Sequence, residues 1–292
     1  MTQPFALSLP GAGAGGRGSI RIWLKAAAYT QRLLLGAATD PWHSGAQYLA
    51  YFSQAHALLK PDVAVLEVGD LYDGWNAAHP GELAAALGNR RKPVTALRKL
   101  LEPEAPRQTL AEVVEAVVAN LRGQTPLVLS VPSPRRWMKL ANVLTGRTDI
   151  EVTGDDVEDA TMYLADLIRS VSAHPISGLL LEEGRDAANF DADDLTRYTA
   201  IVNVVRHYRW SLAVRLPGHA KPAPEALSDF DAVISPDLDQ AGSAALGRDV
   251  SAGFAQGGTA AAVTGRQFYF AEIEPGARPE SVLDALTRLR SG

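Results

Sequence analysis

Residues 51–72 constrain the fold most strongly, because they form a pattern of helix, short turn and buried strand that ends near a carboxylate. Apolar side chains are spaced as on an amphipathic helix up to Pro61, and the apolar run 63–68 follows it as a strand that leads to Asp70. In a barrel of parallel strands, chemistry takes place at the carboxyl ends of the strands. The pattern therefore predicts such a sheet and makes Asp70 a candidate functional residue.

The same unit recurs along the chain. Helices are predicted at 109–121, 156–171, 195–208 and 279–289, and further strands at 20–24, 126–131, 176–181, 210–216, 231–234, 260–263 and 267–273. Continuous apolar strands that alternate with helices indicate a parallel sheet covered on both faces. Eight such strands in 292 residues favour a single (β/α)8 barrel of the TIM type over an open sheet.

The barrel is predicted to span residues 20–292, after a glycine-rich N-terminal segment at 1–19. The glycines at 11–18 are spaced like those of a dinucleotide-binding loop, but the alternation after them predicts a strand. A phosphate-binding loop needs a helix there, so that the amides of its first turn face the phosphates. We therefore expect a mobile loop or a hairpin, which could act as a lid.

Composition narrows the functional classes. A net charge of −5 and a pI near 5.7 argue against nucleic-acid binding and against an anionic membrane surface. The chain has no cysteine, which excludes disulfides, thiolate catalysis and thiolate-bound zinc. The sequence shows neither a signal peptide nor an apolar run of 18 residues, so a cytoplasmic location is expected. We expect no bound metal or cofactor.

Four stretches resemble the uroporphyrinogen decarboxylases. The family's helix leads into an apolar strand with a phenylalanine-serine-aspartate turn, which is Val68-Gly69-Asp70-Leu71 here, and its proline-containing loop is Val131-Pro132-Ser133-Pro134. The matching stretches are 51–72, 113–146, 160–183 and 271–282. The wider superfamily includes cobalamin-independent methionine synthases and methyltransferases that act with corrinoid proteins or coenzyme M. The resemblance implies a barrel and a homodimer.

The chain also departs from this family. The arginine-rich N-terminal motif that grips substrate carboxylates has only Arg17 and Arg21 as candidates, and glutamates at 272 and 274 stand where the family has a histidine. Arg136 and Trp137 occupy the region of an expected tyrosine. Uroporphyrinogen is therefore not the expected substrate. The zinc-dependent methyltransferases use a histidine–cysteine constellation, which a chain without cysteine cannot form.

Three carboxylates are the candidate catalytic residues. The resemblance assigns Asp70 the stabilisation of a positively charged intermediate, whereas a helix N-cap or a loop salt bridge is its structural alternative. Glu182 ends a strand, and with Asp70 or Glu274 it could form an acid–base pair in which repulsion raises one pKa. Metal binding together with His219 and simple pairing with arginine are the alternatives.

Arginines at predicted strand ends suit an anionic substrate, because a guanidinium binds a carboxylate through two hydrogen bonds. Pairing with neighbouring acids is the alternative. Trp75 and His219 lie in predicted loops, where they could line the substrate site. The candidate substrate-binding residues are Arg135, Arg136, Arg185, Arg215, His219 and Trp75, with Arg266 as a further arginine of the same group.

These features support three hypotheses. The first is a cofactor-independent lyase of the decarboxylase type that acts on a small carboxylated molecule. The second is a methyltransferase of the same superfamily with a non-cysteine site and a corrinoid partner protein. The third is a degenerate barrel that binds a ligand without catalysis. A fold shared by many reactions does not decide among them.

Overall fold

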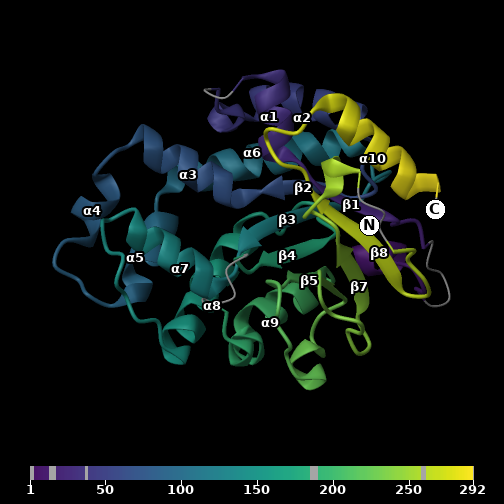
Figure 1. The fold of residues 1–292 in the computed structure, drawn as a ribbon. Coiled ribbons are helices and arrows are strands. Elements are labelled where there is room, and N and C mark those ends of the chain that lie inside the picture. The colour runs from purple at the N-terminus through teal and green to yellow at the C-terminus, as the bar shows by residue number, and fades with distance from the viewer. Residues whose placement is uncertain (1–2, 13–17, 37–38, 185–189, 258–260, 292) are drawn as a thin grey trace.

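The computed structural model describes residues 3–12, 18–36, 39–184, 190–257 and 261–291. Eight parallel strands form one sheet in the order β1-β8-β7-β6-β5-β4-β3-β2, and helices surround it (Figure 1). The sheet curls into a nearly closed barrel, so the predicted single-domain (β/α)8 fold is confirmed. No helix of the described ranges is long and apolar enough to cross a membrane.

The strands are short, and β1, β2 and β3 lead almost directly into a helix at their carboxyl end. The strands are β1 (Ile22–Lys25), β2 (Ala64–Glu67), β3 (Leu127–Pro132), β4 (Gly178–Glu182), β5 (Ser211–Arg215), β6 (Ala232–Ser235), β7 (Ala245–Asp249) and β8 (Gln267–Glu272). The helices are α1 (Ala27–Leu34), α2 (Gly45–Leu59), α3 (Val68–Ala78), α4 (Glu82–Leu87), α5 (Pro93–Leu101), α6 (Glu104–Leu121), α7 (Pro134–Val143), α8 (Gly154–Ser170), α9 (Thr199–His207) and α10 (Pro279–Ser291).

The prediction of a strand at 260–263 is wrong. The strand at this place in the barrel is β7, Ala245–Asp249, which pairs with β6 and β8, and residues 261–263 form no strand. The sequence analysis missed β7 because Gly247 interrupts its apolar run. A Cβ at Gly247 would lie 2.7 Å from Ile234 and 2.8 Å from Phe268. These large neighbours fill the barrel at this point and leave room only for glycine. The strand therefore has no continuous apolar run from which it could be recognised.

The glycine-rich segment is only partly described, since residues 13–17 lie outside the described ranges. The predicted helix at 195–208 is also two elements, a 3₁₀ helix at Ala192–Arg197 and α9. The apolar residues before the glycines form a 3₁₀ helix, Phe5–Ser8. This helix closes the amino end of the barrel, where the amide of Phe5 donates to the carbonyl of Ser177 at 3.1 Å.

Apolar side chains fill the barrel from this end upward. Most of them belong to alternate residues of the strands, because side chains alternate between the two faces of a sheet. The buried cluster is Phe5, Leu9, Ile20, Trp23, Val63, Val128, Leu180, Ala213, Ala232, Ile234, Ala245, Phe268 and Phe270. Since this interior is solid, any chemistry is confined to the carboxyl ends of the strands.

A seam separates β1 from β2, the two ends of the strand order, because the described residues contain no backbone ladder between them. Side-chain carboxylates join the two edges instead. Asp62 accepts hydrogen bonds from the amides of Arg21 and Ile22 at 2.9 and 2.8 Å. At the other end of the seam, Glu67 accepts one from the amide of Ala27 at 3.2 Å. We use "seam" below for this gap.

Substitution of Gly178 by alanine should test the closure of the amino end. A Cβ there would meet the Phe5 ring and lie 2.5 Å from the carbonyl oxygen of Ser211, which is backbone and cannot move aside cheaply. We expect Gly178→Ala to lower the free energy of unfolding by about 1–3 kcal/mol, as overpacking does. Gly218→Ala, whose Cβ would have only an ordinary contact of 3.4 Å to Asp237, is the control for chemical denaturation. Equal stability of the two variants would contradict this account of the closure.

Candidate functional site

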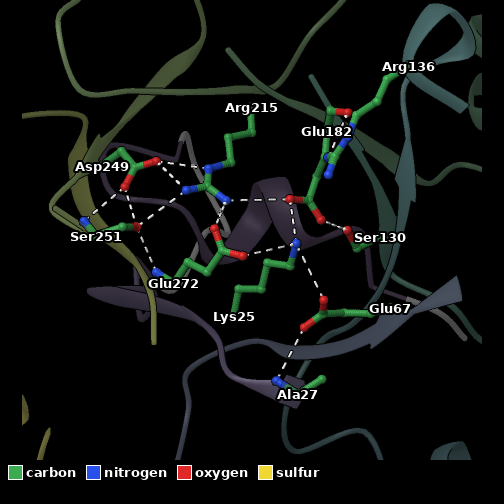
Figure 2. Close-up of polar contacts among 10 residues, drawn as sticks. All are labelled: Lys25, Ala27, Glu67, Ser130, Arg136, Glu182, Arg215, Asp249, Ser251 and Glu272. Carbon is green, nitrogen blue, oxygen red and sulfur yellow. Dashed lines mark hydrogen bonds and ion pairs between the residues drawn. The ribbon is translucent and has the colours of Figure 1, made fainter. Parts of the chain in front are cut away.

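Charged side chains form the uppermost layer of the barrel interior. Their side chains point into the barrel, as those of the apolar core residues do, and they lie at the carboxyl ends of six strands. We call this set the mouth cluster: Lys25 of β1, Glu67 of β2, Glu182 of β4, Arg215 of β5, Asp249 of β7 and Glu272 of β8 (Figure 2). Catalytic residues in barrels of this type come from the ends of several different strands, as these do.

Lys25 joins three carboxylates of the mouth cluster. Its Nζ lies 2.8 Å from Glu182, 3.4 Å from Glu67 and 3.5 Å from Glu272. Burial disfavours the ammonium form, but these three carboxylates outweigh burial and raise the pKa of Lys25 above its usual value. Lys25 is therefore a fixed positive charge at neutral pH.

Arg215 is the second cation of the cluster. Its guanidinium lies 2.6 Å from Glu272, 2.8 Å from Asp249 and 3.5 Å from Glu182, and it sits 4.6 Å over the Phe270 ring. Burial opposes its charge, but the carboxylates of Asp249, Glu272 and Glu182 raise its pKa further. Arg215 thus ties β5 to three other strands and holds the cluster together.

Glu182 lies between the two cations. Burial disfavours its charge, yet Lys25 and Arg215 prevail and lower its pKa, with help from a hydrogen bond that the Ser130 hydroxyl donates. The backbone carbonyl of Glu182 also accepts a hydrogen bond from Arg136 at 3.4 Å. Glu182 is therefore an ionised carboxylate that pairs with both cations of the cluster (Figure 2).

The pKa of Glu67 is shifted in the opposite direction to that of Glu182. Burial raises its pKa to about 8; Lys25 opposes this rise, whereas Asp70 and Glu182 add to it. A carboxyl group with such a pKa carries a proton at neutral pH and can donate it. Glu67 and Glu182 thus differ in protonation although both approach Lys25, and such a pair is suited to acid–base work.

Asp70 lies beside the cluster, in the first turn of α3. Burial raises its pKa to about 6; Lys25 opposes the rise, and Asp73, Glu182 and Asp40 add to it. Among the described residues, no hydrogen bond or ion pair reaches its carboxylate, and it does not cap α3, because Glu67 occupies the N-cap position. The helix-cap alternative is therefore wrong.

The other predicted site residues are not members of the mouth cluster. Arg135 is buried and pairs with Asp194 at 2.5 and 2.9 Å, which ties α7 to the segment before α9. His219 is exposed beside Asp237, and Trp75 stacks on His79 at 3.8 Å between ring centroids. Glu274 is exposed beyond β8.

Arg266 and Arg185 are the two remaining arginines of the predicted group. Arg266 precedes β8 and lies at the opposite end of the barrel, so its placement at the mouth is wrong. Arg185 lies outside the described residues. The geometry thus brings together Glu182, Arg215 and Asp70, with Arg136 at their edge, and it adds Lys25, Glu67, Asp249 and Glu272, which the sequence analysis did not select.

The fold and the mouth cluster define a (β/α)8 barrel with a charged, acid–base constellation at the carboxyl ends of its strands. No family model and no curated protein sequence matches this chain significantly. Among solved structures, the chain is similar to a methyltransferase from Methanosarcina mazei, with a TM-score of 0.59 and 11% sequence identity. That match covers 98% of this chain and 96% of the other, and at this identity it shows the shared fold alone.

Proposed function

We propose that the chain is an enzyme in which Glu67 donates a proton to the reacting group. The observation that carries this proposal is the largely buried Glu67 carboxyl beside Lys25 and Glu182 at the mouth of the barrel. Lys25 and Glu182 hold opposite fixed charges next to it, and Asp70 supplies a second carboxyl that titrates closer to neutrality than a free aspartate. General acid–base catalysis needs such a matched set of groups.

Within this class, we propose methyl transfer as the reaction. The full-length likeness to a methyltransferase supports it, as does the resemblance of 51–72 and 271–282 to the uroporphyrinogen decarboxylase and methionine synthase superfamily. A methyl group bound to a nitrogen, oxygen or sulfur atom would pass to a nucleophilic acceptor, and Glu67 would give its proton to the departing atom. The resemblance suggests a corrinoid on a partner protein as that acceptor.

Zinc activation of a thiol does not fit this chain. The sequence has no cysteine, and the described residues contain no group of three or more His, Cys, Asp or Glu arranged for a metal ion. Lys25 and Arg215 occupy the positions between the carboxylates of the mouth cluster. Activation of the leaving group therefore falls to the proton of Glu67.

The decarboxylase-type lyase is less well supported by the site. It needs arginines that hold substrate carboxylates, but Arg215 and Arg135 are committed to acidic partners. Four carboxyl groups face two cations in the mouth cluster, which disfavours an anionic substrate at the reacting end. Arg136, half-buried with one long contact to Glu182, is the residue that could bind a carboxylate there. Our proposal therefore puts methyl transfer first.

An assay with reduced cobalamin as acceptor tests the proposal, using methylated amines, ethers and thioethers as donors. We expect methylcobalamin to form with at least one donor class, and Glu67→Gln to lower the rate by about 10²–10⁴-fold, as loss of a general acid does. Glu115→Gln, on the exposed face of α6, should keep the wild-type rate.

The same protein is offered a panel of small carboxylic acids. Release of carbon dioxide that requires Asp70, without methyl transfer, would replace the proposal with the lyase. If neither reaction occurs, the proposal fails and the hypothesis of a barrel that binds a ligand without catalysis replaces it.

A further inference from the structure

A cavity of about 60 Å³ lies beside the seam, between the barrel wall and α2. Leu24 and Ala27 line it from the side of β1, Val65 and Glu67 from the side of β2, and Tyr51 and His56 from α2. Because no ladder joins β1 to β2 in the described chain, the barrel wall is not sealed here. The cavity therefore touches a member of the mouth cluster from outside the barrel.

Glu67 faces both sides of this wall. One carboxyl oxygen lies 3.4 Å from Lys25 in the mouth cluster, and the other accepts from the amide of Ala27 across the seam at 3.2 Å (Figure 2). The groups that act on Glu67 from the barrel side are Lys25, Asp70 and Glu182. Lys25 and Glu182 keep their charges at neutral pH, so neither supplies a replacement proton. Asp70, with a pKa of about 6, binds its proton less tightly than Glu67 and has mostly lost it at neutral pH.

Polar groups line the cavity beyond Glu67. The hydroxyls of Tyr51 and Thr30 lie 2.6 Å apart, and burial raises the pKa of Tyr51 to about 12, so its hydroxyl keeps its proton. His56 stacks on Phe52 and its Nδ1 is buried without a hydrogen-bond partner. Buried polar atoms are almost always hydrogen-bonded, to protein or to water. A cavity of this size has room for water, since one water molecule needs roughly 10–15 Å³ of such space.

We propose that the seam cavity is a hydrated proton path, which leads from Glu67 past the Tyr51 and Thr30 hydroxyls to His56. It rests on the proposed role of Glu67 as proton donor, and it supplies what that role requires: a route by which a buried carboxyl regains its proton after each turnover. His56 is half-buried on α2, so it contacts both the cavity and the surface. Burial lowers the pKa of His56, which favours the neutral ring that can accept and pass on a proton.

Infrared spectroscopy of the whole chain tests this path without a substrate. The protonated carboxyl of Glu67 has a carbonyl stretch that Glu67→Gln removes, and its shift in D₂O reports how fast the proton exchanges. We expect His56→Phe, which keeps the stacking on Phe52, to slow this exchange by about 100-fold, as loss of a proton-relaying group does. Tyr51→Phe should slow it as well. His207→Phe, at an exposed position of α9, should leave it unchanged.

The outcomes separate the two proposals. If the carbonyl band is present and exchanges equally fast in wild type and His56→Phe, the path is refuted and the role of Glu67 stands. If the wild-type protein shows no band that depends on Glu67, the proton donor itself is absent and both proposals fail.

Discussion

Replacement of Arg215 by methionine is expected to lower the free energy of unfolding by about 3–5 kcal/mol, the usual cost of removing one partner from a buried ion pair. The Arg215 side chain is only 7% exposed, and its partners Asp249 and Glu182 are 8% and 5% exposed. Without the guanidinium, these carboxylates keep their burial but lose a counter-charge. Methionine fills a similar volume, so the loss measures charge and not a cavity.

Chemical denaturation at neutral pH measures this effect, with Arg206→Met as the matched control. Arg206 also pairs with an aspartate, Asp229, but its side chain is 65% exposed. Exposed pairs contribute about 0–1 kcal/mol, so the control should be close to wild type. Equal stability losses in the two variants would show that Arg215 does not hold the mouth cluster together.

The second large effect concerns the pH dependence of stability. Because burial raises the pKa of Glu67 from 4.5 to about 8, the folded chain keeps a proton that the unfolded chain releases. Between these two pH values, the unfolded state binds fewer protons, so Glu67 makes folding less favourable as the pH rises. Glutamine is uncharged throughout. We therefore expect Glu67→Gln to resemble wild type near pH 5 and to be more stable than wild type near pH 8, by roughly 4 kcal/mol at 1.4 kcal/mol per pKa unit.

Urea denaturation of both proteins across this range measures the difference. Asp70, whose pKa is raised to about 6, acts in the same direction at lower pH and is present in both proteins, so it cancels in the comparison. A stability difference that stays constant from pH 5 to pH 8 would show that Glu67 is already ionised in the folded protein.

The sequence predicts the architecture because the strands of a parallel barrel are continuous apolar runs, and such runs can be recognised in short stretches of sequence. It does not predict β7, because Gly247 and the charged residues after it give no apolar run. The alternation of side chains also reveals which strand ends face inward. Glu182 and Arg215 could be selected on that ground, since each is the last residue of a clear strand.

The rest of the site depends on contacts between distant segments. Glu67 sits inside an apolar run and reads as part of the strand, and Lys25 lies one residue beyond the predicted strand at 20–24. Their significance comes from Glu182, more than a hundred residues away in sequence. Arg135 is the converse case. It has the guanidinium expected of a substrate-binding residue, but it pairs with Asp194, 59 residues further along the chain. The spacing of residues along the sequence does not predict either of these contacts.

A ¹³C NMR titration of the side-chain carboxyl carbons, in wild type and Glu67→Gln, tests the central claim most directly. The account predicts one glutamate carboxyl that titrates near pH 8, which is missing from the variant. If every glutamate of the wild-type protein instead titrates near its ordinary pKa of about 4.3, Glu67 is no proton donor and the mouth cluster is not the acid–base centre proposed here.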